Sequence, residues 1–237
     1  MILTGHQPNY LPYLGFFHKI ATADAFVLVD TVQFVKRGPF GWIHRNRIRA
    51  SGPEGWMWLS VPVLTRGKFT QSIAEARIDD HVPWRRKHWR SLQLAYGRHP
   101  HFAEHAPFFE ALYGRPWESL SALSEEIIRY LMKAFGITTP FHRASDLHPE
   151  GAAGELILDL CRKLKADAYL SGVHGRDYLD PMAFERAGIR LAFQEFLHPE
   201  YSQAPFEGFV PNLSAVDFLF AAGPKSGEIL RASGPRG

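Results

Sequence analysis

Four hydrogen-bonding side chains crowd a loop near the start of the chain: His6, Gln7, Asn9 and Tyr10. The loop follows a short apolar run, Ile2–Thr4, which predicts a buried strand. Ligands of open α/β sheets bind beyond the carboxyl ends of the strands, and the helix after such a loop offers free N–H groups to an anion. Because histidine titrates near neutral pH, His6 is the candidate general base. The alternative is a structural loop whose polar groups satisfy its own backbone.

A second polar group follows the next apolar run, Phe26–Val29. Asp30 ends that run, and Gln33 comes shortly after it. Parallel strands end at the same edge of a sheet, so side chains that follow neighbouring strands can reach one ligand. Asp30 is therefore the second candidate catalytic residue, either orienting His6 or binding substrate hydroxyls, and Gln33 is a candidate substrate ligand. The alternative is that Asp30 caps a local turn.

The segment Thr31–Pro53 contains no acidic residue and carries several cations. Arginine binds phosphate or carboxylate through a planar fork, whereas lysine acts as a point charge. We predict an anion site with Lys36, Arg45, Asn46 and Arg47 as its ligands. A solvated basic loop is one alternative. A groove for nucleic acid is another, because aromatic residues alternate with arginine here.

Two later segments hold further candidates for the same pocket. Ser171 and Gly172 follow the apolar run Ala168–Leu170, where glycine permits a close approach between backbone and ligand. Tyr201 and Gln203 precede the last predicted helix, and caps and turns explain them almost as well.

Composition limits the class of protein. The chain has 237 residues, of which 46% are hydrophobic, which is enough for one sizeable core. A formal charge of +3 does not by itself indicate a nucleic-acid partner. The single cysteine, Cys161, excludes an internal disulfide, fits a reducing compartment and lies on an apolar helix stripe. The chain shows no leader-like start and no apolar run long enough to cross a membrane, so a cytoplasmic protein is expected.

Several familiar chemistries are missing from the sequence. It contains no GxSxG elbow, P-loop, CxxC or HExxH motif. We therefore expect no metal site, and no cofactor is indicated.

The elements that would position these residues alternate between strand and helix. This pattern predicts a single α/β domain with a Rossmann-like parallel or mixed sheet flanked by helices. The predicted core strands are Ile2–Thr4, Phe26–Val29, Ala168–Leu170 and Ile189–Phe193. A further strand, Trp56–Val63, is expected to pair with Ile73–Ile78. The main predicted helices are Tyr13–Ala21, Pro83–Ala95, Pro100–Tyr113, Trp117–Phe135, Gly154–Lys165 and Ser214–Ala221. The domain is expected to span residues 1–222, with a loosely ordered tail at 223–237.

Several segments, in order along the chain, carry a family resemblance. They are HQPNYLPYLGFFHKIATADAFVLVDTVQFVKR from His6, RNRI from Arg45, WLSVPV from Trp58, YLSG from Tyr169, the Y-x-Q of Tyr201, and LSAVDFLF from Leu213. Together they resemble the WbqC-like protein family over nearly the whole chain. The stretch RGPFGWIHR, Arg37–Arg45, holds additional residues relative to the compact loop of that family.

The resemblance implies a bacterial protein of surface-polysaccharide synthesis of the O-antigen type. Together with the candidate residues it predicts a transferase that moves an acyl, aminoacyl or nucleotidyl group to or from an activated or amino sugar. The expected partner is a small anionic substrate, a phosphorylated or nucleotide-linked sugar, and a nucleic-acid partner is disfavoured. The alternative is a non-catalytic ligand-binding accessory protein of the same pathway. The sequence leaves the oligomeric state open.

Overall fold

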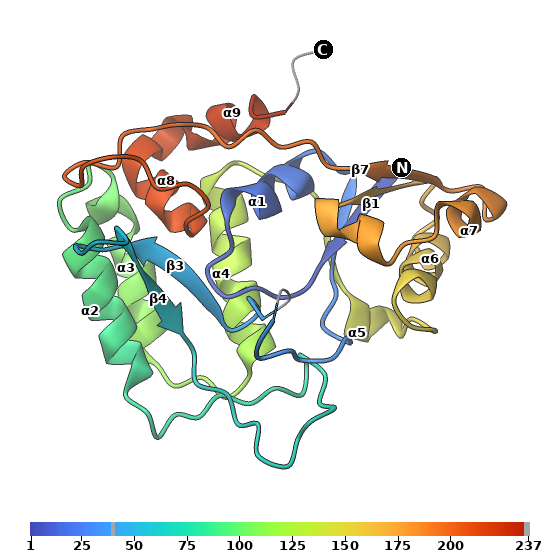
Figure 1. Cartoon of the computed structure of the whole chain (residues 1–237), viewed down its shortest axis with the longest axis horizontal. Helices are drawn as coiled ribbons and strands as arrows, with labels where there is room; N and C mark the ends of the chain where they lie inside the picture. Colours follow the sequence, from blue (N-terminus) through green and yellow to red (C-terminus); the bar gives the residue numbers. More distant parts are fainter. Residues whose placement is uncertain (39–40, 235–237) are drawn as a thin grey trace.

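The larger of the two sheets has five parallel strands and lies on the right in Figure 1. The computed structural model describes residues 1–38 and 41–234. The strands lie in the order β5-β2-β1-β6-β7, and every pairing is parallel. Their bounds are β1 Ile2–His6, β2 Ala25–Leu28, β5 Phe141–Arg143, β6 Ala168–Ser171 and β7 Arg190–Phe193. The predicted α/β class is confirmed, and all of the expected core strands are present.

Helices cover both faces of this sheet, which explains why β2 is apolar throughout. Phe26 and Leu28 join one core cluster, whereas Ala25 and Val27 join the cluster on the opposite face. The first face is covered by α1 Leu14–Ala21, α4 Leu120–Ala134 and α8 Ala215–Ala222. The second is covered by α5 Ala144–Leu147, α6 Gly154–Lys163 and α7 Pro181–Arg186.

The residues at the two ends of the long helix α4 explain where it begins and where it ends. At its start, the side chain of Ser119 accepts a hydrogen bond from the backbone N–H of Ala122. Its apolar stripe, which includes Leu123 and Ile127, is fully buried. At its end, Gly136 takes a left-handed backbone with φ of +63°, which a side chain would disfavour.

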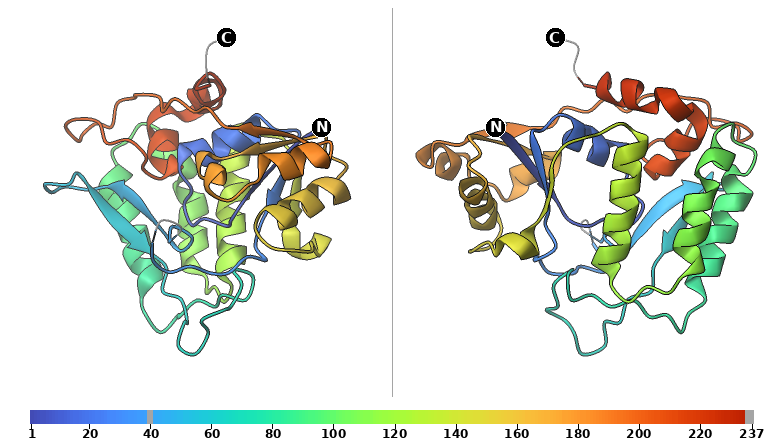
Figure 2. Two further views of the ribbon diagram at one scale, coloured as in Figure 1. Left: turned by 45° about the vertical axis from the view of Figure 1, so that its right-hand side comes forward. Right: turned by 180° about the vertical axis from the view of Figure 1, so that it is seen from behind.

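A second layer lies beside the sheet. It consists of an antiparallel hairpin, β3 Arg45–Arg49 and β4 Trp56–Ser60, and the helices α2 Trp84–Tyr96 and α3 Phe102–Gly114. Figure 2, seen from behind, shows α4 between the parallel sheet and this layer.

The partner of β4 differs from the expected one. β4 pairs with β3, and the expected Ile73–Ile78 strand is reduced to an isolated bridge between Val63 and Ile78. The physical reason is an arginine–tryptophan face on the hairpin: Arg45 stacks on the Trp58 ring with its Cζ 4.4 Å from the ring centroid.

The C-terminal segment contains two short helices. Residues 223–234 of the expected tail include the 3₁₀ helix η2 Gly223–Lys225 and the helix α9 Ser226–Arg231. Leu230 is fully buried in the core that α1 lines, which anchors the segment. Residues 235–237 of the predicted tail lie outside the described residues. Within the described chain, no helix is long and apolar enough to cross a membrane.

Candidate ligand-binding site

The order of the strands reverses between β1 and β6. From β1 the sheet extends through β2 to β5, whereas from β6 it extends the other way to β7. Such a switch point leaves a crevice beyond the carboxyl ends of the strands, where open α/β sheets bind their ligands. A cavity of about 740 Å³ occupies this place, a size suited to a small ligand. Its walls include Gly5 and His6 at the end of β1 with Gln7 just after it, and Ser171 at the end of β6 with Gly172 just after it.

A buried lysine, Lys19 of α1, forms part of the wall. It is 3% exposed, and its Nζ donates a hydrogen bond to the carbonyl oxygen of Gly5, 2.9 Å away. A Cβ on Gly172 would lie 3.8 Å from the same Nζ, so the amine sits between the ends of β1 and β6. None of the ion pairs in the described part of the chain includes Lys19. Burial lowers the pKa of Lys19 to about 7.

His6 is half-buried and faces the same cavity. Its Nδ1 lies 3.0 Å from the carbonyl oxygen of Gln7, so Nδ1 donates and Nε2 is left as an acceptor. Its ring packs against Phe16, with the centroids 4.7 Å apart. Burial, followed by the charge of Lys19, lowers the pKa of His6 to about 3. His6 is therefore neutral at pH 7 and suited to accept a hydrogen bond from a ligand.

Positive charge reaches the cavity from the hairpin. Arg47 lines it, and the Cζ of this residue lies 5.4 Å from the Trp42 ring centroid and 5.0 Å from that of Trp56. Its Nη2 donates to the carbonyl oxygen of Asn212 at 3.3 Å, whereas its Nε is buried with no hydrogen-bond partner among the described residues. Burial lowers the pKa of Arg47, yet arginine keeps its charge in proteins. The guanidinium is thus held by its aromatic neighbours with hydrogen-bonding capacity left unused.

The N-terminus of α1 lies at the same wall. Tyr13 is the N-cap residue and makes no side-chain capping bond, and both Tyr13 and Gly15 line the cavity. The first N–H groups of a helix have no partner within the helix and carry a partial positive charge. An anionic group of a ligand would find this end of α1 favourable.

Part of the site expected from the sequence comes together at this cavity. The predicted residues among its walls are His6, Gln7, Asn9, Asn46, Arg47, Ser171 and Gly172. Asn46 also has a structural task, because its Nδ2 donates to the Leu11 carbonyl oxygen at 2.6 Å and its Oδ1 accepts from the Arg47 N–H at 2.8 Å.

Tyr10 and Asp30 were expected to converge on His6, but the structure gives each another environment. The Tyr10 hydroxyl is fully buried and bonds to His88 Nδ1 at 2.8 Å and to the Tyr113 hydroxyl. The carboxylate of Asp30 accepts from the N–H and the hydroxyl of Ser145, at 2.9 and 2.7 Å, where it caps the start of α5. Neither side chain lines the cavity. The catalytic role assigned to Asp30 stays a prediction; its carboxylate caps a helix 115 residues away in sequence, not the local turn of the alternative.

Three residues of the basic segment also lie outside the cavity wall. Gln33 is exposed and donates to the carbonyl oxygen of Phe69 at 2.8 Å, and Lys36 is exposed. Arg45 donates to the carbonyl oxygen of Gly41 at 3.1 Å while it stacks on Trp58. Of the predicted cations, only Arg47 lines the cavity.

Tyr201 and Gln203 are hydrogen-bonded to the buried carboxylate of Asp217. The Tyr201 hydroxyl and the Gln203 amide both donate to Oδ2 of Asp217, at 2.7 and 2.8 Å. Burial raises the pKa of Asp217, which lies fully buried at the start of α8. These two residues therefore hold the C-terminal loop to α8 and are not part of the cavity wall.

The structure adds cavity residues that the sequence did not single out. They include Lys19, Tyr13, Trp42, Tyr169 and Gln194. The sequence did carry one signal for Lys19: it is a charged residue in the short helix LGFFHKIA, where every position from Leu14 to Ile20 proves to be buried. Trp42 belongs to the additional stretch Arg37–Arg45, of which Pro39 and Phe40 lie outside the described residues.

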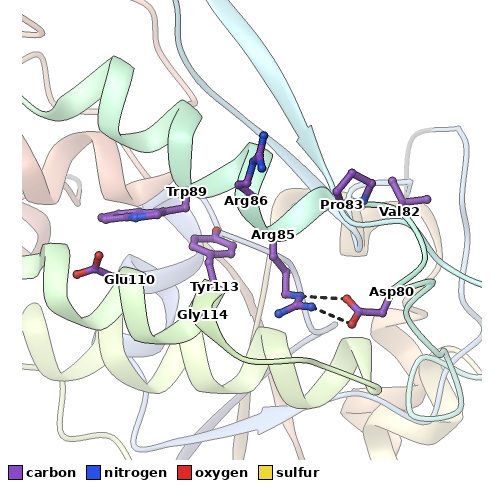
Figure 3. Close-up of a pocket in the computed structure, with 9 residues that line it drawn as sticks. All are labelled: Asp80, Val82, Pro83, Arg85, Arg86, Trp89, Glu110, Tyr113 and Gly114. Atoms are coloured by element: carbon purple, nitrogen blue, oxygen red, sulfur yellow. Dashed lines mark hydrogen bonds and ion pairs between the residues drawn. The ribbon is translucent and has the colours of Figure 1, made fainter.

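A smaller cavity of about 410 Å³ lies between α2 and α3 (Figure 3). Its most polar feature is Arg85, which donates to both carboxylate oxygens of Asp80 at 3.0 Å. The pair neutralises itself, and none of the lining residues comes from a strand of the sheet. It is a weaker candidate for a functional site than the switch-point cavity.

A doubly wound parallel sheet with a cavity at its switch point defines an α/β protein of the Rossmann type. The chain belongs to the WbqC-like protein family, whose model matches residues 7–229, and the resemblance drawn from the sequence is confirmed. It is also 34% identical over 227 residues, 95% of each chain, to "Uncharacterized protein Rv1507c" of Mycobacterium tuberculosis. No solved structure matches the chain. The matched region includes most of the residues that line the cavity.

Proposed function

We propose that this protein is a transferase that binds a phosphorylated or nucleotide-linked sugar in the switch-point cavity. One observation carries the proposal: Arg47 and the uncapped N-terminus of α1 both open onto a cavity large enough for such a ligand. Together they supply a fixed charge and backbone donors, the combination that recognises phosphate.

The reacting end of the ligand would lie near His6 and Lys19. His6 offers Nε2 as an acceptor for a sugar hydroxyl or ammonium group. Strongly shifted pKa values beside a cavity are typical of catalytic sites, and both residues have them. This favours an enzyme over the alternative, a non-catalytic accessory protein. The transferred group, acyl, aminoacyl or nucleotidyl, and a role in O-antigen-type synthesis remain part of the proposal and follow from the family resemblance.

Calorimetry with a panel of nucleotide-linked sugars tests the proposal, with mass spectrometry on the same mixtures to detect turnover. Arg47→Gln should weaken binding at least tenfold, because hydrogen bonds to charged groups contribute roughly 1.5–3 kcal/mol. Arg45→Gln is the matched control, since Arg45 lies two residues away on the same strand but outside the cavity.

Equal affinity of the two variants would contradict the anion site. Tight binding without turnover of any added acyl, aminoacyl or nucleotidyl donor would favour the accessory protein. Thermal unfolding of both variants checks that the loss of arginine–tryptophan stacking has not unfolded the hairpin.

A further inference from the structure

We infer that Lys19 is a nucleophilic amine that forms an imine with a carbonyl group of the ligand, so that the substrate is an anionic sugar with a free aldehyde or ketone. The inference goes beyond the proposed function, and it rests on that function only for the anionic part of the ligand.

The amine of Lys19 is placed where a carbonyl group of a ligand can reach it. Nζ of Lys19 lies between the carbonyl oxygen of Gly5 and the backbone of Gly172, at the crevice where ligands of this fold bind. Its hydrogen bond to Gly5 occupies one N–H direction and fixes the end of the side chain. Gly172 carries no side chain, so a reacting carbonyl can approach from the side of β6.

The surroundings of the Lys19 amine are those of a reactive amine and differ from those of a structural cation. A lysine that served only as a structural cation would be expected beside a carboxylate, because burying an unpaired ammonium is costly. Lys19 has no such partner among the ion pairs of the described residues, and His6, which faces the same cavity, is neutral. A desolvated lysine of this kind is the usual form of an imine-forming residue.

The chemistry balances without an outside oxidant or reductant. The lone pair of Nζ attacks the carbonyl carbon, a C–N bond forms, and the carbonyl oxygen takes up the proton that the nitrogen loses. The hydroxyl then leaves with a second proton from the nitrogen as one molecule of water, and a C=N bond remains. Water reverses both steps and returns the free lysine.

Pyridoxal 5′-phosphate is a suitable probe because it carries an aldehyde and a phosphate. The full chain is incubated with the probe at pH 7 and reduced with borohydride, which adds hydride to the imine carbon and leaves a secondary amine. Peptide mass spectrometry then locates the adducts. At this pH the neutral fraction of Lys19 exceeds that of an ordinary lysine by roughly a thousandfold. We expect at least tenfold more labelling at Lys19 than at the exposed Lys163.

The variants separate this inference from the proposed function. Lys19→Met should remove the specific adduct, whereas Lys163→Met should leave it. Pyridoxal without phosphate should also label Lys19, and Arg47→Gln should reduce labelling by the phosphorylated probe alone. An adduct that does not depend on Arg47 supports the imine and contradicts the anion site. Labelling of Lys19 in the wild-type chain no higher than that of Lys163 overturns the inference, even if nucleotide-linked sugars bind.

Discussion

Lys19 occupies an interior position that few lysines tolerate. Its chain is buried, yet its amine reaches the cavity and bonds only to the backbone carbonyl of Gly5 among the contacts described above. Its pKa of about 7 lies below the ordinary value of 10.5, so the folded protein favours the neutral amine. Residues whose burial destabilises the folded state are commonly found at functional sites.

Removing this lysine should stabilise the fold at neutral pH. Below pH 7 Lys19 is protonated in both the folded and the unfolded state, and burial of its charge destabilises the folded state. Between pH 7 and 10.5 Lys19 is protonated only in the unfolded state. This destabilisation of the folded state therefore declines as the pH rises. We expect Lys19→Met to raise the free energy of unfolding by about 2 kcal/mol at pH 7. Urea unfolding at pH 7 and 9.5 measures the gain, which should shrink at the higher pH. A less stable variant at both pH values would contradict this account.

His6 should matter for its acceptor, not for its charge. His6→Ala removes Nε2 and should lower turnover at least a hundredfold, while the fold stays intact because His6 is only half-buried. His6→Gln can restore an acceptor and should recover part of the activity. Steady-state rates of the two variants, with circular dichroism as a control for folding, test this. Unchanged turnover in His6→Ala would remove His6 from the reaction.

At the scale of elements, the turn after β6 packs closely against the strand end. This turn is the 3₁₀ helix η1, Val173–Asp177, and a Cβ on its Gly175 would lie 1.9 Å from Oγ of Ser171. Ser171 is 2% exposed and cannot move aside freely. The turn therefore depends on glycine to bring its backbone to the wall of the cavity.

Gly175→Ala should displace η1 and weaken both the fold and the site. The expected loss of stability is about 1–3 kcal/mol, as for other overpacked positions. Gly114→Ala is the matched control, because a Cβ there meets nothing within 4 Å. Differential scanning calorimetry and ligand titration on the two variants measure the difference, and equal melting temperatures would show that η1 adapts.

Individual elements show how far a sequence can predict this molecule. Short apolar runs located β1, β2, β6 and β7, and the run is clearest in β2, which is buried on both faces and therefore apolar throughout. β3 escaped notice because its alternating arginines are stabilised by Trp42, Trp56 and Trp58, contacts that periodicity does not encode. The environment of Asp30 could not be predicted either, because its hydrogen-bond partner Ser145 is 115 residues away in sequence. Burial of Lys19 likewise depends on which helices cover α1.

The whole molecule should lose stability in mild acid. Burial lowers the pKa of His6 to about 3 and those of His44 and His88 to about 4, all below the ordinary value of 6.5. As the pH falls below 6.5, these histidines bind protons in the unfolded chain but stay neutral in the folded chain. The free energy of unfolding therefore falls.

Urea unfolding between pH 7.5 and 5 should reveal this dependence, at about 1–2 kcal/mol for each buried histidine. His88→Asn removes one titrating group and keeps an acceptor for the Tyr10 hydroxyl, so the slope of stability against pH should become shallower. A slope identical to that of the wild type would show that His88 does not contribute.

The pairing of β1 with β6 has a consequence for how the chain acquires its site. Ile2 lies beside Ala168, so the two strands that frame the cavity are separated by most of the chain. During synthesis, β1, α1 and β2 emerge early and can associate, but the crevice has only one side until residue 171 has left the ribosome. Contacts between such distant segments form slowly. The half-built sheet would meanwhile expose the edge of β1, the strand that later lies at the centre, which makes nascent chains stalled before β6 the form most prone to aggregate.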